Sequence, residues 1–387
     1  MDVARGIGDL HSWGAYQVPN EGHSGKGLNM KKTVLSILAA VLLAMPAMAA
    51  DLKMKVKAPP PPPPSPWDLA FGDAIMSDYE FRGITQSNHK PSVAAYFEPR
   101  YNFTSAFQGY VGLSGESIDF PNHAAAEIDF YGSFRPTFDK LALDFGAWYY
   151  YYPGGQCFSG GTFTATGALA LSGFQACNNF NSGGNFVPNL NFPGGLTFDP
   201  LPNGNVVKAN VSWVEAYGKG TWTISDNWSL GGQVYWSPSV ANSGAWGTYA
   251  AGTLKFTAPS GALPSDIGFY ASVDGGYWWF GTSDAFYGVI SPGNPSFVNG
   301  IPYTSYGNVD FGIGFTWKVF TLDLRGYWSG LNRGDCNAFT SDHTAFSPGN
   351  GTAINPGPPT GFGFGSNWCD ARFVAKLSSD LTLANLK

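Results

Sequence analysis

The feature that most constrains the fold is a strict alternation of polar and apolar residues with a period of two. In residues 308–318 the even positions carry Asn, Asp, Gly, Gly, Thr and Lys, whereas the odd positions carry Val, Phe, Ile, Phe and Trp. Successive side chains of a β-strand point to opposite faces, so this segment is predicted to be a strand with one polar face and one apolar face. The pattern recurs in residues 92–101, 127–135, 269–274 and 321–325.

The amino-acid composition indicates whether the apolar faces contact lipid or a protein core. Only 12% of the residues are charged, against about 25% in soluble domains, while 44% are hydrophobic and 16% aromatic. Past residue 50 no apolar run approaches the roughly 20 residues of a membrane-spanning helix. A closed barrel places apolar strand faces in lipid without exposing unpaired backbone groups. The alternative is a soluble β-sandwich with an aromatic core, whose outer faces would carry more charge.

The fold class predicted is all-β, a transmembrane antiparallel up-and-down barrel of about 12 strands, with 10–14 allowed. The strands are expected near residues 67–82, 92–103, 107–118, 126–137, 141–152, 206–223, 228–237, 248–257, 266–280, 304–317, 320–330 and 371–384. Short and long connections alternate between them, as outer-membrane barrels require. A shift of parity near Trp213 predicts a β-bulge.

Aromatic residues are expected to form two girdles at the membrane interfaces. One girdle is predicted just before the long connections, at residues 148–152, 235–236, 277–280 and 327–328. The other flanks the short turns and comprises Phe103, Phe107, Phe138, Trp222, Trp228, Trp317 and Phe320.

The residues before the barrel divide into three segments. Residues 1–29 are interpreted as translated upstream sequence. Residues 30–49 have the basic, apolar and small-residue order of a signal peptide, with cleavage near Ala49; an uncleaved anchor is the alternative. Residues 50–66 are interpreted as a Lys/Pro-rich periplasmic linker, because six consecutive prolines hold an extended rod. Attachment to a periplasmic partner is the other interpretation of this linker. The barrel is assigned to residues 67–387.

The candidate pore-lining residues are the ionisable residues at positions that the alternation places on the inner face of the barrel. They are Asp78, Glu80, Arg82, Glu98, Arg100, Glu116, Glu127, Asp129, Arg135, Asp144, Glu215, Lys219, Asp274, Asp310, Lys318, Asp323, Arg325, Arg372 and Lys376. Charged rings set the ion preference of a pore, whereas a mixed wall can also close a narrow lumen through its own salt bridges. Both outcomes are compatible with this set.

Several motifs resemble the TorF family of porins. They are the Phe-Gly-Asp at 71–73, the Ser-Asp-Tyr-Glu-Phe-Arg-Gly-Ile-Thr-Gln-Ser at 77–87, the Glu-Ile-Asp-Phe-Tyr-Gly at 127–132 and the Tyr-Tyr-Pro ending at Pro153. The resemblance runs from about residue 67 to the end of the chain, the long loops excepted. It implies an outer-membrane barrel with a channel role.

Four cysteines lie in two predicted external loops, Cys157 with Cys177 and Cys336 with Cys369. An oxidising compartment favours disulfides, and pairing within each loop is predicted from the three possible connectivities. The spacings do not fit a zinc site, so no metal site and no cofactor are expected. The histidines have no nucleophile motif near them, and Glu127 and Asp129 lie among many wall charges, so no enzyme is expected.

The function expected is passive diffusion of small polar solutes through a porin-like channel in the outer membrane of a Gram-negative bacterium. The alternative is a non-conducting barrel that displays its external loops as an adhesin, receptor or structural protein. The partners expected are outer-membrane lipid, small polar solutes and the barrel-assembly machinery, with homo-oligomers left open. The net charge of −6 argues against nucleic acid.

Overall fold

The computed structural model describes most of the barrel. It covers residues 65–156, 207–264, 266–287, 299–350 and 362–383, with four short strands inside the connection 152–212. Residues 1–29, the predicted signal peptide and nearly all of the linker lie outside the described residues, as do Cys157 and Cys177. The unit that begins at Pro66 is described here by itself.

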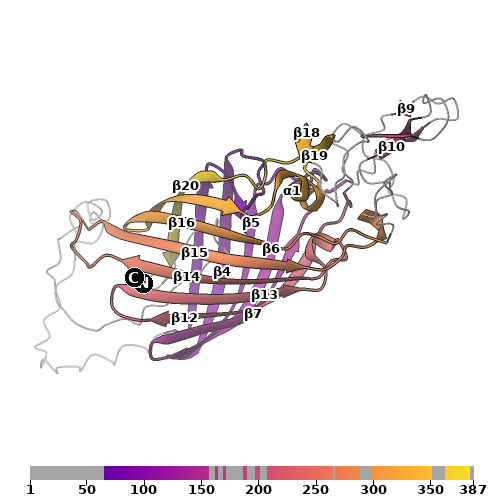
Figure 1. Cartoon of the computed structure of the whole chain (residues 1–387). Helices are drawn as coiled ribbons and strands as arrows, with labels where there is room; N and C mark the ends of the chain where they lie inside the picture. Colours follow the sequence, from indigo (N-terminus) through magenta and orange to yellow (C-terminus); the bar gives the residue numbers. More distant parts are fainter. Residues whose placement is uncertain are drawn as a thin grey trace, which may run out of the picture. The chain divides into compact units, whose positions relative to one another are not determined.

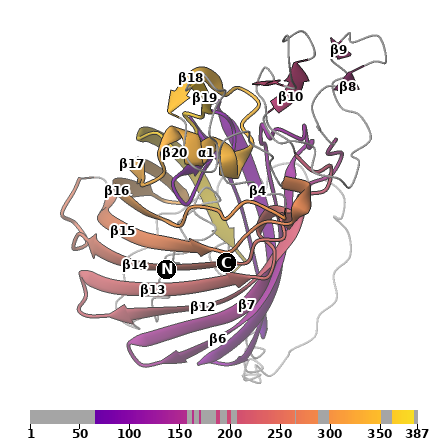
Figure 2. The ribbon, with the colours of Figure 1, turned by 45° about the vertical axis from the view of Figure 1, so that its right-hand side comes forward.

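Twelve antiparallel strands form a closed barrel within the described residues, so the predicted fold class is confirmed (Figures 1 and 2). In ring order from β1, the neighbours are β20, β17, β16, β15, β14, β13, β12, β7, β6, β5 and β4. The strands are β1 (Trp67–Met76), β4 (Ser92–Thr104), β5 (Phe107–Glu116), β6 (Glu127–Phe138), β7 (Leu141–Tyr151), β12 (Trp213–Thr223), β13 (Trp228–Ser237), β14 (Gly247–Thr257), β15 (Gly268–Phe280), β16 (Tyr306–Trp317), β17 (Phe320–Ser329) and β20 (Arg372–Thr382). Pairing of β1 with β20, from Ala70 opposite Thr382 to Met76 opposite Lys376, closes the ring.

The two faces of the strands differ as the alternation predicts. On β6, Ile128, Phe130 and Phe134 point outward, whereas Glu127 and Asp129 are buried on the inner face. Large apolar side chains remain exposed all around the ring, from Val93 on β4 to Phe373 on β20. An apolar outer face of this extent is the surface that lipid requires, and it rules out the β-sandwich. Among the described residues, no helix is long and apolar enough to cross a membrane.

Short turns and long connections alternate around the barrel as predicted. The long connections, at 77–91, 117–126, 152–212, 238–246, 281–305 and 330–371, all begin and end at the same end of the barrel, called here the loop end. They carry β2 (Glu80–Phe81), β3 (Ile84–Thr85), β8 (Thr162–Phe163), β9 (Leu169–Ala170), β10 (Phe186–Asn189), β11 (Thr197–Pro200), η2 (Val240–Asn242), η3 (Ala285–Tyr287), α1 (Arg333–Thr340), β18 (Phe346–Asn350) and β19 (Phe362–Gly365).

Two predicted strand boundaries are wrong. The first strand ends at Met76 rather than 82, because Asp78 accepts hydrogen bonds from Thr85 and Ser87 and so closes the following residues into a separate turn. β12 begins at Trp213 rather than 206, and its pairing with β7 runs without a register shift, so the predicted bulge is absent. The alternation of polar and apolar residues changes phase near Trp213 because the residues before it do not belong to the strand. Asn210 accepts a hydrogen bond from the Ser212 backbone N–H, and this irregular segment ends there.

Inward glycines let tyrosines lie flat over neighbouring strands. A Cβ at Gly112 would meet the ring of Tyr131 at 2.1 Å, and one at Gly314 would meet the ring of Tyr270 at 2.0 Å. Tyr131 and Tyr270 are the directly opposite residues on the adjacent strands. Glycine therefore provides the room that an aromatic inner wall needs, which accounts for part of the 51 glycines in the chain.

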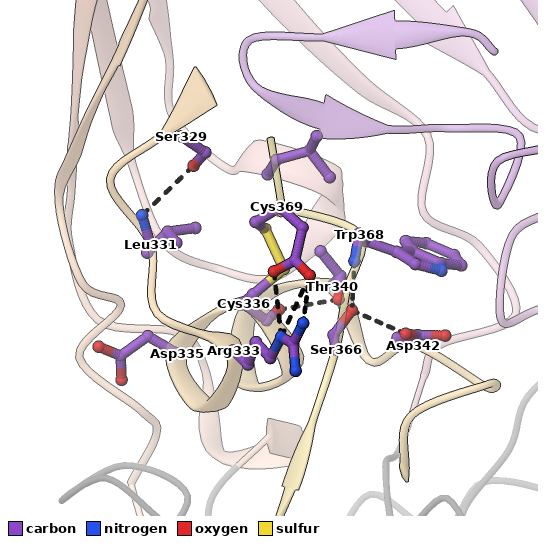
Figure 3. Close-up of a disulfide and its surroundings, with 12 residues drawn as sticks. Ser329, Leu331, Arg333, Asp335, Cys336, Thr340, Asp342, Ser366, Trp368 and Cys369 are labelled. Carbon is purple, nitrogen blue, oxygen red and sulfur yellow. Dashed lines mark hydrogen bonds and ion pairs between the residues drawn. A yellow bond between two sulfur atoms is a disulfide. The ribbon is translucent and has the colours of Figure 1, made fainter. Parts of the chain in front are cut away.

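A disulfide holds the last long connection together (Figure 3). Cys336 on α1 is joined to Cys369 just before β20, with the Cα atoms 6.0 Å apart. The Asn332 side chain caps the helix by accepting a bond from the Asp335 backbone, and Arg333 forms an ion pair with Asp370 at 2.6 Å. The other predicted disulfide, between Cys157 and Cys177, lies outside the described residues.

A charge placed on the outer face should destabilise the barrel. Val111 lies at the middle of β5 and is 62% exposed, so Val111→Lys puts an ammonium group in the hydrocarbon core. We expect the free energy of unfolding from lipid vesicles to fall by about 2–4 kcal/mol. Ser105→Lys, in an exposed short turn, is the control and should change it little. Equal effects of the two substitutions would contradict the assigned membrane-facing surface.

Candidate functional site

The first long connection folds into the barrel as a small hairpin. β2 and β3 pair through Glu80 with Thr85 and Phe81 with Ile84, leaving Arg82 and Gly83 as the two turn residues. Both have positive φ, 51° and 86°, as the favoured two-residue hairpin turns require. A Cβ at Gly83 would lie 3.1 Å or less from side chains of β16 and β17, so the hairpin tip contacts the barrel wall.

Arg82 reaches from this tip to the opposite side of the ring. Its guanidinium donates two hydrogen bonds of 2.8 Å to the two carboxylate oxygens of Glu215 on β12, and Tyr150 donates a third bond to that carboxylate. Strands β12 to β15 lie across the barrel from β1 and β4, between which the hairpin arises. The hairpin therefore spans the lumen at the loop end.

An aromatic cage surrounds the Arg82 guanidinium. Its central carbon lies 4.4–4.8 Å from the ring centroids of Phe81, Tyr235, Tyr249 and Trp278. Cation–π attraction strengthens when the cation is removed from water, and Arg82 is only 7% exposed. The cage and the carboxylate together compensate the burial of this charge.

Three further contacts fix the hairpin segment to the wall. Tyr79 donates a 2.6 Å bond to Glu127 on β6, and Tyr306 on β16 donates to the Arg82 carbonyl at 2.9 Å. Arg372 on β20 forms an ion pair with Glu80 at 2.5 Å. Because these partners come from separate parts of the ring, the segment is held from several sides.

The cage corrects one prediction. The aromatic runs before the long connections were assigned wholly to a membrane girdle, yet alternate rings point inward. Tyr149, Tyr151, Trp236 and Trp279 are exposed on the outer face, whereas Trp148, Tyr150, Tyr235 and Trp278 are buried inside. Successive aromatic side chains therefore alternate between the outer and inner faces, as polar and apolar side chains do elsewhere in the strands. The predicted girdle at the short turns is exposed throughout.

Below the hairpin, one charge cluster lies on the β15–β17 wall. Arg325 is 1% exposed and pairs with Asp274 at 3.3 Å, Asp310 at 2.5 Å and Asp323 at 3.2 Å. Tyr270 donates a 2.5 Å bond to Asp323. One guanidinium thus links carboxylates from three strands.

A second cluster lies on the β4–β7 wall, across the ring from the first. Glu98 binds Arg100 at 2.6 Å and Arg135 at 3.2 Å, and Arg135 binds Asp144 at 2.9 Å. The Arg135 guanidinium also lies over the Tyr110 ring, 3.7 Å from its centroid. In each cluster, these ion pairs join side chains of the same wall.

The structure places most predicted pore residues on the inner face of strands, with four exceptions. Asp78, Glu80 and Arg82 belong to the inserted segment 77–91 and not to the wall, because the first strand ends before them. Lys318 is exposed in the short turn between β16 and β17. Lys219 and Lys376 point inward from β12 and β20.

Three carboxylates of the predicted set meet near the loop end. Glu116, Glu127 and Asp129 each offer an oxygen within 4.8 Å of the others. They are the only such group of potential metal ligands among the residues that the structure describes.

At the loop end two carboxylates hold basic side chains. Asp78 lies 3.0 Å from His89 Nδ1, and this hydrogen bond raises the pKa of His89 above its ordinary 6.5 despite partial burial. Burial alone would raise the pKa of Asp119, but hydrogen bonds from Lys90 and Asn88 lower it below its usual value.

An apolar cavity of about 110 Å³ lies between the hairpin and the long connections. Phe81 and Ile84 line it from the hairpin, and Phe120, Tyr303 and Phe339 line it from three other connections. It is large enough for a small apolar group.

Sequence comparison gives one family match. The model of the family described as a bacterial protein of unknown function (Gcw_chp) matches residues 61–172, which include the hairpin and β1 to β7. No curated protein matches the chain in sequence.

Solved structures with a similar arrangement include outer-membrane proteins. A loop-deletion mutant of OmpT, an outer membrane protein of Vibrio cholerae, is 8% identical with a TM-score of 0.30, over 81% of this chain and 98% of the other. A Pseudomonas aeruginosa FadL homologue is 9% identical with a TM-score of 0.34, over 82% and 89%. A bacterial polysaccharide outer membrane secretin is 10% identical with a TM-score of 0.30, over 82% and 97%.

Removing the cation from the cage should destabilise the protein. Arg82→Met leaves Glu215 buried without its partner, so the free energy of unfolding should fall by about 3–5 kcal/mol. Adding Glu215→Gln should restore part of that loss. Arg333→Met breaks an exposed Arg–Asp pair and should cost about 1 kcal/mol or less. A loss for Arg82→Met no larger than for this control would contradict the role of the cage.

The pH dependence of the hairpin segment follows from His89. Because its pKa is raised in the folded state, the pair with Asp78 stabilises the segment fully below pH 6.5 and is lost as the pH rises through the raised value. Histidine NMR titration should show Asp78→Asn lowering the pKa of His89. Asp284→Asn, which removes the carboxylate that binds Lys208 in another long connection, is the control and should leave the pKa of His89 unchanged.

Proposed function

We propose that the protein is a narrow diffusion channel of the bacterial outer membrane for small polar solutes, with the hairpin β2–β3 as its constriction. The observation that carries this proposal is the hairpin's span of the lumen, secured by the Arg82–Glu215 pair. An inward connection that narrows a barrel fixes the size of solute that passes. The resemblance of residues 77–87 to the TorF family of porins supports the same function.

The polar inner wall favours a hydrated path below the hairpin. Side chains of Arg135, Asp144 and Asp310 keep exposed fractions of 26%, 16% and 14% although they point inward. Burying charges without water costs several kcal/mol per ion, and apolar replacements often stabilise a protein. A barrel that served only as a loop scaffold would be more stable with an apolar interior, so the retained charges support conduction.

The contacts of the histidine in the hairpin segment support a non-enzymatic role. His89 Nδ1 faces Asp78, but its Nε2 faces the carbonyl of Asn367 at 3.2 Å and not a nucleophile. A catalytic histidine would need a hydroxyl or thiol within hydrogen-bond reach. We therefore propose passive passage, with membrane lipid and the barrel-assembly machinery as the general partners of such a barrel.

The cavity favours a second candidate function. Its aromatic lining and its position among the long connections suit the binding of a small apolar ligand at the loop end. A non-conducting barrel that displays these connections would use such a cavity. Conductance separates the two candidates.

Opening the constriction should increase conductance. In planar bilayers, refolded residues 50–387 should give small discrete steps, and the double variant Arg82→Ala/Glu215→Ala should give steps several-fold larger. Removing both partners leaves no unpaired charge, so the barrel is expected to fold.

The double variant Arg333→Ala/Asp370→Ala is the matched control. It removes an arginine–carboxylate pair from the last long connection and should conduct like the wild type. Heat-modifiable electrophoretic mobility would establish folding for each protein. Absence of steps from both the folded wild type and the folded lumen variant would contradict the channel and favour the loop-displaying barrel.

A further inference from the structure

Strand register brings three acidic side chains together inside the barrel. Glu116 at the end of β5 lies directly opposite Glu127 at the start of β6, and Asp129 is the next inward residue of β6. Their exposed fractions are 2%, 2% and 0%. Like charges directly opposite one another destabilise an antiparallel pair, and burial strengthens the repulsion. This arrangement therefore needs either a compensating charge or protons shared among the carboxylates.

No basic side chain provides such a charge among the described residues. Neither carboxylate oxygen of Glu116 accepts a hydrogen bond, and Oδ1 of Asp129 is likewise without a donor, although all three atoms are buried. This contrasts with the other inner carboxylates, such as Glu98, Glu215 and Asp310, each of which binds an arginine. The unpartnered Glu116 points at its acidic neighbours.

The groups that donate toward the cluster are neutral, namely hydroxyl groups and the indole N–H of Trp148. Tyr79 and Tyr152 donate bonds of 2.6 Å and 2.7 Å to the two oxygens of Glu127, and Ser114 lies 3.4 Å from Asp129. A carboxylate oxygen has a second lone pair, so Glu127 can accept these bonds and still bind a metal ion. The hydroxyls orient one ligand and do not neutralise the cluster.

We propose that Glu116, Glu127 and Asp129 bind a divalent cation of the calcium type. Each of the three residues offers an oxygen, and these atoms lie within 4.8 Å of one another, about twice the 2.3–2.6 Å calcium–oxygen distance. Ligands on opposite sides of one ion are separated by that amount, so a single ion fits between them. Bidentate binding by the carboxylates supplies up to six oxygens, and the Ser114 hydroxyl is close by.

The ligand set favours calcium over other divalent ions. All three ligands are carboxylates, with no sulfur or imidazole among them, so zinc and copper are poorly matched. Magnesium demands near-ideal octahedral geometry and keeps several waters, whereas this cluster is closed by Tyr79 and Tyr152. The site is independent of conduction and goes beyond the proposed channel.

The bound ion would also anchor the hairpin segment. Tyr79 belongs to residues 77–91 and donates to Glu127, so an ion that fixes Glu127 also fixes the root of the hairpin. The cation site and the Arg82 cage thus hold the two ends of one segment.

The experiment measures cation binding to refolded residues 50–387. The protein is refolded in calcium, in magnesium or in chelator, and its Tm is measured in each. Calcium at about a hundredfold above its Kd should raise the Tm by about 4 °C, and magnesium should raise it less. Terbium, which replaces calcium, should show luminescence sensitised by the nearby tyrosines, and calcium should displace it.

The variant Glu116→Gln shows whether the three carboxylates bind a cation or only share protons among themselves. In chelator this variant should be more stable than the wild type, because it removes a like charge, but it should lose the calcium response and at least about tenfold in terbium affinity. Glu98→Gln, in the cluster neutralised by arginines, is the matched control and should keep both. A wild-type Tm indifferent to calcium, or a Glu116→Gln variant that binds terbium like the wild type, would overturn the proposal.

Discussion

Closure of the ring is the constraint on which the rest of the structure depends. A strand in lipid must pair its backbone groups on both edges, because no water is present to replace a missing partner. The pairing of β1 with β20 removes the last free edges. Once the ring is closed, side chains can point only to lipid or to the lumen. The apolar outer belt, the inward glycines beneath tyrosines and the enclosed ion pairs all follow from that division.

The part of the fold that depends on this division could be predicted from the sequence. The alternation in residues 308–318 predicted β16, and the spacing of turns predicted the order of short and long connections, because each strand meets lipid on one side. The interior could not be predicted in the same way. Parity predicted Arg82 as an inward residue of the first strand, whereas it lies in the inserted hairpin and its partner Glu215 lies 133 residues later in the chain. The contact between Glu116 and Glu127 depends on a register that only the pairing of β5 with β6 reveals.

The lumen is divided along its length into regions of different chemistry. At the loop end, aromatic rings surround one buried guanidinium, and three carboxylates gather beside the root of the same hairpin. Farther from the loops, arginines and carboxylates pair along each wall, and Arg135, Asp144 and Asp310 keep part of their surface exposed. The rings of the aromatic region pack on one another, as the stacked rings of Tyr150 and Trp213 do at 4.5 Å. In the proposed channel, a solute that entered from the loop end would meet the hairpin first and the charged walls afterwards.

The separation of Arg82 and its partners along the chain also sets a condition on the assembly of the barrel. The hairpin belongs to the first residues of the barrel to be synthesised, whereas its partners on β12 to β15 are made later. Until those strands have joined the growing sheet, Arg82 has neither its carboxylate nor its aromatic rings. Arg372, which pairs with Glu80, belongs to the last strand of the ring. The mouth of the barrel therefore reaches its final form only after the last strand of the ring has been made.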